Sequence, residues 1–150
     1  MVRTENTEKH RDKSKIENRK SKIVFYDGNC PMCNSWVKRI IQWDDRKIFK
    51  FAALEGETAK ELLTPLLPDY LKEDTIIYYD DGRIYMRSNA ALKIFNALGI
   101  PYKFGSVFAI VPSFLRDGVY RWVANRRYKY GKRYDSCPVP PVEWRDRFLG

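Results

Sequence analysis

A short apolar run that turns directly into an amphipathic helix dominates the N-terminal half of the chain. Residues Lys22–Tyr26 are β-branched or aromatic after the first lysine, and Asp27-Gly28 ends the run, so we predict a buried strand followed by a turn. Pro31 suits the first turn of a helix, where its missing N–H costs nothing. Apolar side chains then recur at spacings of three and four, which predicts one buried helix face. They are Trp36, Val37, Ile40, Ile41 and Trp43.

A second strand and a second helix follow. Lys47–Leu54 alternates in part between apolar and polar residues and predicts a strand, which leads through Gly56 into a helix around Glu57–Leu67. Pro65 and Pro68 are expected to shorten that helix.

A hairpin is the clearest motif in the centre of the chain. Two alternating runs, Thr75–Tyr79 and Arg83–Arg87, flank Asp80-Asp81-Gly82, and an Asp-Gly pair supplies the positive φ that tight hairpin turns require. Ser88 is the expected N-cap of a helix over Asn89–Leu98, which Gly99 ends.

The C-terminal third is predicted to add helices and then an irregular segment. Helical residues extend from Phe104 to about Tyr130 with a break at Pro112, and Asp135–Gly150 contains three prolines. The order of strands and helices predicts a βαβ unit with two parallel strands, completed by the hairpin and its helix. We therefore expect an α/β fold, most simply a thioredoxin-like four-stranded mixed sheet with flanking helices and a C-terminal helical extension. Other small α/β folds have the same order.

The predicted domain boundaries follow from charge and composition. Residues 1–21 are a basic segment expected to be disordered, 22–138 form the thioredoxin-like domain, and 139–150 form an irregular C-terminal tail. The 150 residues carry 28 Lys or Arg against 19 Asp or Glu, and a second basic excess lies between Arg116 and Arg133. Clustered cations can bind nucleic acid or anionic membrane, but no nucleic-acid motif accompanies them, so we expect a solvated face.

Aromatic residues interleave with this second basic segment. Base stacking would use them, but packing of a helix face against the sheet explains most of them equally well. They are Tyr120, Trp122, Tyr128, Tyr130 and Tyr134. Tyr26, Trp36 and Trp43 are expected in the core or in a pocket wall.

The expected compartment is the cytoplasm. No apolar run approaches the ~20 residues of a membrane helix, and residues 1–22 are too polar for a secretory signal peptide. Thiols are normally kept reduced in the cytoplasm, where a cysteine pair is more often catalytic or metal-binding than structural.

Cys30-Pro31-Met32-Cys33 lies at the predicted junction between the first strand and the first helix. A thiol at a helix N-terminus is near unpaired N–H groups and the positive end of the helix dipole, which favour the thiolate. We expect Cys30 to be the more exposed nucleophile and Cys33, one turn on, to attack the resulting mixed disulfide. The pattern predicts thiol–disulfide exchange.

Asp27 precedes Cys30 by three residues. Its carboxylate is a candidate acceptor for the Cys33 proton during exchange. An Asp-Gly pair after a strand is also a common turn, in which the side chain accepts backbone N–H groups. The two roles are compatible.

Other roles for the cysteines remain open. A structural zinc site needs about four ligands, and only Cys137 and His10 are further Cys or His candidates, so we expect no metal. Cys137 is either a third redox thiol or, more often for a lone cysteine, a small apolar residue.

The segment Asp27–Cys33 (DGNCPMC) resembles the D-G-x-C-x-x-C signature of the DCC family, also called DUF393, of predicted thiol-disulfide oxidoreductases. The likeness extends over roughly residues 22–138, through the hairpin and Ser88-Asn89-Ala90-Ala91. It then includes Pro112, Arg116-Asp117, Tyr120, Asn125–Tyr128, Gly131 and Cys137. The resemblance implies a thioredoxin-like fold with Asp27, Cys30 and Cys33 as the defining residues.

The sequence also departs from better-known thioredoxin-like proteins. Thioredoxins and glutaredoxins have a cis-proline just before the third strand, whereas Leu71–Thr75 precedes that strand here and the nearest proline is Pro68. The glutathione-binding elements of glutaredoxins are not recognisable either. Neither substrate capture at that loop nor glutathione dependence is therefore expected.

The sequence as a whole predicts a thiol-disulfide oxidoreductase with no cofactor besides its own dithiol. Its expected partners are a disulfide-containing protein or small molecule and an external reductant. The alternatives are a non-catalytic binding module whose basic helix contacts nucleic acid or anionic membrane, and a metal-binding protein.

Overall fold

A computed structural model of the chain describes residues 21–72, 75–99, 110–126 and 139–149. Its strands are β1 (Lys22–Tyr26), β2 (Phe49–Ala53), β3 (Ile77–Asp80), β4 (Arg83–Met86) and β5 (Phe148–Leu149). The α-helices among these residues are α2 (Pro31–Trp43), α3 (Glu57–Leu63), α4 (Arg87–Leu98) and α5 (Ser113–Arg126), and the 3₁₀ helices among them are η1 (Tyr70–Lys72) and η4 (Val142–Arg147). None of the helices in this described part is long and apolar enough to cross a bilayer.

The strands form one mixed sheet in the order β4-β3-β1-β2-β5. β1 pairs with β2 in parallel and with β3 antiparallel, and β3 and β4 form the predicted hairpin. β1 occupies the centre, and its residues Ile23–Tyr26 are buried, which explains why the sequence shows a continuous apolar run there instead of alternation. The α/β class and the thioredoxin-like arrangement are confirmed.

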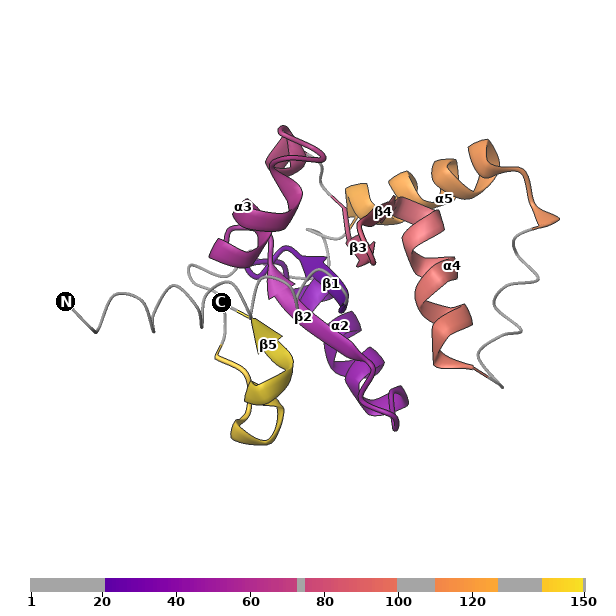
Figure 1. Ribbon diagram of the computed structural model, residues 1–150. Helices are drawn as coiled ribbons and strands as arrows, with labels where there is room; N and C mark the ends of the chain where they lie inside the picture. The colour runs from indigo at the N-terminus through magenta and orange to yellow at the C-terminus, as the bar shows by residue number, and fades with distance from the viewer. Residues whose placement is uncertain (1–20, 73–74, 100–109, 127–138, 150) are drawn as a thin grey trace.

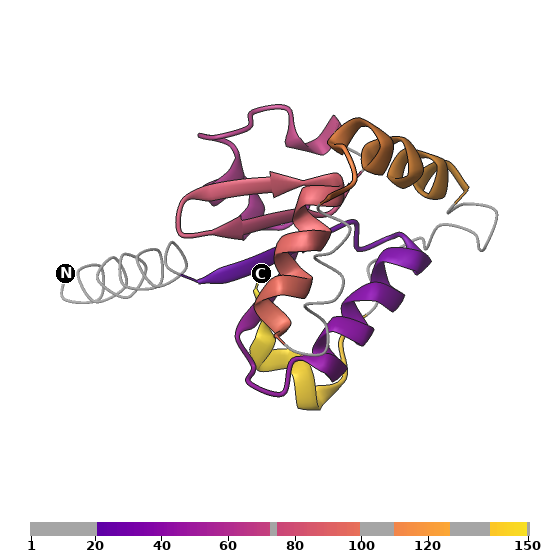
Figure 2. The ribbon, with the colours of Figure 1, turned by 90° about the vertical axis from the view of Figure 1, so that its right-hand side faces the viewer.

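Helices cover both faces of the sheet (Figure 1). On one face Val24, Phe49 and Tyr78 pack with the buried sides of α2 and α4. On the other face Ile23 and Phe25 pack against α3 and η1. In Figure 2 α4 runs in front of the strands, α2 lies to the right of α4, and α5 lies across one end of α4.

The hairpin turn adopts the predicted backbone. Asp81 has φ 47° and Gly82 has φ 81°, so both central residues are left-handed, as a tight hairpin turn requires. The positive φ at Asp81 agrees with the tolerance of Asp for this conformation.

The C-terminal end differs from the prediction. Residues 139–150 were expected to be irregular and the sheet to have four strands, but η4 and β5 form in this segment and β5 adds a fifth strand. β5 pairs in parallel with β2, so the folded unit extends beyond the predicted boundary at residue 138. A strand of two residues is too short to produce a periodic pattern, which is why the sequence did not predict it.

Two helix boundaries also differ. The N-cap of α4 is Met86 and not Ser88, because Ser88 lies inside the helix and its hydroxyl donates to Asp117 Oδ1 at 2.5 Å. α3 ends at Leu63, ahead of the Leu67 expected, because Pro65 has no N–H with which to continue the helical hydrogen bonds.

Candidate active site

The turn between β1 and α2 brings the predicted site residues together. Asp27 Oδ1 accepts the Asn29 N–H at 3.0 Å, and the Asp27 carbonyl accepts the Cys30 N–H at 3.2 Å. The predicted turn role of Asp27 is therefore confirmed. Four residues separate the end of β1 at Tyr26 from the start of α2 at Pro31, so Cys30 and Cys33 are held near the end of β1.

Asn34 fixes this turn to the helix. Its side-chain amide donates to the Gly28 carbonyl at 2.7 Å and to the Cys30 carbonyl at 3.0 Å. The sequence did not predict this role of Asn34. The available signal was an amide side chain directly after the Cys-x-x-Cys motif, where it can donate to the backbone of the preceding turn. These bonds restrain the backbone on both sides of the first cysteine.

Cys30 is the N-cap residue of α2. Its sulfur accepts the Cys33 backbone N–H at 3.5 Å, and Pro31 occupies the first helical turn. The first turn of α2 contains no acidic side chain, so no carboxylate in that turn offsets the positive end of the helix dipole at the sulfur. No disulfide joins Cys30 and Cys33 in the structure.

The relative exposure of the two thiols is the reverse of the prediction. Cys30 is 0% exposed and Cys33 is 6% exposed, and both belong to the core on the α2 face of the sheet. A helix N-terminus was expected to leave Cys30 accessible, but its sulfur turns back toward the first helical turn to accept the Cys33 N–H. Of the two cysteines, only Cys33 has any surface exposed to solvent.

Tyr120 connects α5 to the start of β3 beside this site. Its hydroxyl lies 2.8 Å from Thr75 Oγ1 and accepts the Ile76 backbone N–H at 3.2 Å. Burial raises the pKa of Tyr120, the hydrogen bonds to Thr75 and Ile76 oppose this rise, and the negative charge of a Cys33 thiolate adds to it. The Tyr120 hydroxyl therefore binds the backbone N–H of Ile76, just before β3. Other thioredoxin-like proteins have a cis-proline at this place, which this sequence lacks.

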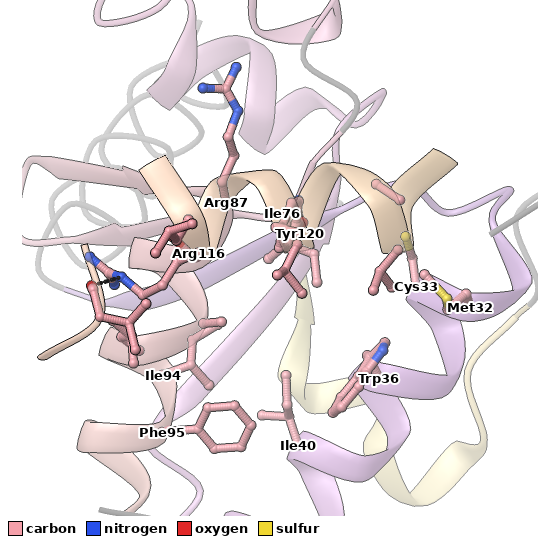
Figure 3. A pocket seen from close by; sticks show the side chains of 18 residues that line it. Met32, Cys33, Trp36, Ile40, Ile76, Arg87, Ile94, Phe95, Arg116 and Tyr120 are labelled. Carbon is pink, nitrogen blue, oxygen red and sulfur yellow. Dashed lines mark hydrogen bonds between the residues drawn. The ribbon is translucent and has the colours of Figure 1, made fainter. Parts of the chain in front are cut away.

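A cavity of about 690 Å³ opens beside Cys33. Side chains from α2, α4 and α5 line it, most of them aliphatic or aromatic (Figure 3). Trp36 and Ile40 of α2 contribute to one wall and Tyr120 to another. The sequence analysis placed Trp36 in the core or a pocket wall, which is confirmed, but it did not predict the cavity.

Some predictions lie outside the described residues. These are the residues 1–20 of the basic segment, Cys137, Tyr128, Tyr130 and Tyr134. Within the described ranges, no three His, Cys, Asp or Glu side chains converge as metal ligands would.

The fold and the site together define a class of protein. A parallel β1–β2 pair, an antiparallel hairpin and a Cys-x-x-Cys turn at the start of α2 characterise thioredoxin-like proteins with a dithiol at a helix N-terminus. Residues 24–133 match the model of the DCC1-like thiol-disulfide oxidoreductases, and the chain belongs to this family. The predicted family resemblance is confirmed.

Two proteins from other organisms are similar to this chain over most of its length. It is 33% identical over 129 residues to the uncharacterized protein YuxK of Bacillus subtilis, covering 86% of this chain and 94% of YuxK. It is 34% identical over 127 residues to a chloroplastic DCC family protein of Arabidopsis thaliana, covering 83% of this chain and 73% of that protein. No solved structure matches the chain.

Proposed function

We propose that this protein catalyses thiol–disulfide exchange through Cys30 and Cys33. The observation that carries the proposal is the Cys33 N–H donated to Cys30 Sγ at 3.5 Å, with Cys30 at the N-cap of α2. A backbone donor and a helix N-terminus both stabilise a thiolate on Cys30. The name of the family supports the same reaction type.

The proposed reaction has two steps. The Cys30 thiolate attacks a substrate disulfide, forms a mixed disulfide and releases the first substrate thiolate, which takes up a proton. Cys33 then loses its proton, with Asp27 as the proposed acceptor, and attacks Cys30 Sγ to close the Cys30–Cys33 disulfide and release the second thiol. The protein loses two electrons and two protons and the substrate gains them, so the dithiol needs no resident cofactor. An external thiol reductant restores it.

The burial of Cys30 makes the order of attack a testable part of the proposal. Thiolate stabilisation favours Cys30 as the first nucleophile, whereas its 0% exposure means that the covering groups must move before a substrate reaches it. Cys33 as the first nucleophile is the alternative order, and its contact with the cavity favours it.

Trapping distinguishes these orders. We would treat Cys33→Ser and Cys30→Ser with 5,5′-dithiobis(2-nitrobenzoate) at equal concentration and measure the mixed disulfide by mass spectrometry. The proposal expects Cys33→Ser to accumulate a stable mixed disulfide on Cys30, and wild type to release the label and form the internal disulfide. If Cys33 in Cys30→Ser is trapped faster than Cys30 in Cys33→Ser, Cys33 is the first nucleophile and Cys30 the second. No internal disulfide in wild type, together with no insulin reduction, contradicts the redox function.

The proposed site of action is the cytoplasm, where a reducing thiol pool regenerates the dithiol. The Arabidopsis relative is instead a chloroplastic protein.

A binding function of α5 is the second candidate. None of its residues is fully buried, and Phe114 and Trp122 are 73% and 56% exposed, with Arg126 stacked over the Trp122 ring. Such a surface fits an anionic membrane or RNA. Binding to anionic vesicles or RNA that weakens steeply with salt and is unaffected by Cys30→Ser supports this candidate.

A further inference from the structure

The cavity beside Cys33 has the volume of a small-molecule site. Its volume of about 690 Å³ falls within the range of ligand pockets, roughly 300–1,000 Å³. Cys33, the site cysteine with surface exposed to solvent, is part of its wall. Leu115, Val119 and Val123 of α5 also line it and are 51%, 64% and 39% exposed, so the cavity opens to solvent along this helix. A molecule that enters the cavity therefore reaches a thiol of the candidate active site.

The charged groups of the lining do not face the interior of the cavity. Figure 3 shows the guanidinium groups of Arg87 and Arg116 directed away from Cys33 and from the apolar side chains. The hydroxyl of Ser88, which also lines the cavity, donates to Asp117. A charged ligand group inside the cavity would lose its water and find no partner among these side chains, which is unfavourable. The part of a ligand that the cavity buries is therefore uncharged.

Hydrocarbon side chains supply most of the surface that a ligand would contact. Trp36 and Ile40 come from α2, and Ile94 and Phe95 come from α4 (Figure 3). Burial of a ligand's apolar surface against them stabilises the complex in proportion to the area removed from water.

The backbone next to the cavity does not offer a free donor to an extended peptide. The Ile76 N–H, just before β3, already donates to the Tyr120 hydroxyl at 3.2 Å, and this hydroxyl also lies 2.8 Å from Thr75 Oγ1. A peptide that paired with this end of β3 would have to displace Tyr120. A small molecule held by apolar side chains needs no such exchange, so the arrangement favours a small-molecule substrate.

We propose that the cavity is the binding site for small, uncharged apolar disulfides, whose hydrocarbon part occupies it with the sulfurs against Cys33. The reaction rests on the proposed function. For a substrate R–S–S–R, one protein thiolate attacks a sulfur and forms a mixed disulfide, and the first RS⁻ leaves and takes up a proton. The other cysteine loses its proton and attacks the protein sulfur, which releases the second RS⁻ as a thiol and closes the Cys30–Cys33 disulfide. The substrate gains two electrons and two protons, and the protein loses them.

Labelling of Cys33 tests the cavity without turnover of the dithiol. We would treat the full chain carrying Cys30→Ser with methyl, propyl and butyl methanethiosulfonate and measure the rate at Cys33 by mass spectrometry, so that labelling of Cys137 is counted separately. Each rate is divided by the rate of the same reagent with glutathione. We expect this ratio to rise about fourfold per methylene, which corresponds to ~0.8 kcal/mol for each one buried.

Charged reagents give the second comparison. The 2-sulfonatoethyl and 2-(trimethylammonio)ethyl methanethiosulfonates should both give lower ratios than the propyl reagent. Both signs are needed because the net charge of +9 attracts the anion on its own. Equal ratios for all five reagents overturn the proposal.

A filled cavity should lose the dependence on chain length. Ala91 of α4 lines the cavity, so Ala91→Trp would occupy part of it. Asn96 is exposed on the same helix and outside the lining, which makes Asn96→Trp the matched control. The dependence should disappear in Ala91→Trp and persist in Asn96→Trp, and its persistence in both overturns the proposal. If Ala91→Trp does not fold, the comparison of reagents on Cys30→Ser alone remains decisive.

Turnover tests the substrate class. We would oxidise the reduced wild-type protein with 2,2′-dithiodipyridine or with 6,6′-dithiodinicotinate, which adds one carboxylate to each ring, and again divide each rate by that with glutathione. A preference for the uncharged disulfide that Ala91→Trp abolishes and Asn96→Trp retains supports the assignment, and equal ratios overturn it. If Cys33 labelling depends on chain length but no disulfide yields a Cys30–Cys33 bond, the proposed function and the substrate class are both wrong. The cavity is then an apolar binding site without redox turnover.

Discussion

Asp27 has a turn role in the structure and a catalytic role in the proposal, and one substitution separates them. Asp27→Asn retains an Oδ1 acceptor for the Asn29 N–H, so the turn should persist, but the amide accepts no proton. We expect disulfide reduction to slow by roughly 10²-fold with little change in the thermal midpoint. Asp27→Ala should lower both the rate and the midpoint. An unchanged rate in Asp27→Asn would leave Asp27 with the turn role alone.

Tyr78 makes the stability of the fold depend on alkaline pH. Burial raises the pKa of Tyr78, and Asp80, which accepts its hydroxyl at 3.2 Å and also binds Lys22, adds to the rise. Below about pH 10 the phenol is neutral in both states, whereas above it the unfolded chain ionises first. Stability is therefore present below about pH 10 and is lost as the pH rises toward the folded pKa.

Urea unfolding at about pH 8 and pH 11 tests this. We expect the wild-type midpoint to fall between the two, and Tyr78→Phe, which keeps the ring, to show a smaller fall. Tyr120→Phe should behave similarly, because its pKa is also raised. Identical falls in wild type and Tyr78→Phe would contradict the assignment.

The sequence predicted which residues form the candidate site better than it predicted how exposed those residues are. Asp27, Cys30 and Cys33 were predicted at a strand–helix junction, because local motif and periodicity determine where the turn falls. The exposure of Cys30 depends on which side chains pack over the junction, and no local pattern contains that information.

Among the elements, the hairpin and α5 offer a matched pair of glycines. A Cβ at Gly82 or at Gly118 would meet nothing within 4 Å, so an alanine at either position reports on the backbone alone. Gly82 has φ 81°, and Gly82→Ala should destabilise the protein by about 1 kcal/mol. Gly118 lies within α5, and Gly118→Ala should stabilise that helix by about 0.5–1 kcal/mol. Chemical denaturation measures the first effect, and hydrogen exchange of α5 amides measures the second. Effects of the same sign would contradict the prediction.

The contrast between hairpin and α4 explains which elements the sequence could predict. An Asp-Gly turn imposes its backbone locally, so the turn was predicted correctly and the bounds of its two strands to within two residues. Ser88 had the right chemistry for an N-cap, but Arg87, with φ 55°, already begins α4, and Asp117 of a distant element accepts the serine hydroxyl. A tertiary contact thus determined the role of a residue with a strong local preference.

On the scale of the whole molecule, the end of the chain is held by a buried ion pair. Arg147 Nη2 donates to Asp44 Oδ2 across 103 residues of sequence, and the Arg147 guanidinium also donates to the Phe49 carbonyl at 3.2 Å. Asp44 caps the C-terminus of α2 and accepts the Ile48 and Phe49 N–H groups at 3.2 and 3.0 Å. One carboxylate therefore joins a helix end, the start of β2 and η4, next to the edge strand β5 that the sequence did not predict.

A double-mutant cycle tests whether this pair holds β5 in the sheet. Arg147→Met leaves the Asp44 carboxylate buried without its cation, and such a loss costs roughly 3–5 kcal/mol. Asp44→Asn combined with Arg147→Met removes both charges, so we expect the double variant to be less destabilised than the sum of the singles by about 1 kcal/mol or more. Urea denaturation supplies the free energies, and hydrogen exchange of the Leu149 amide reports on β5. Additive effects, or protection of that amide in Arg147→Met, would mean that strand pairing holds the C-terminus without the ion pair.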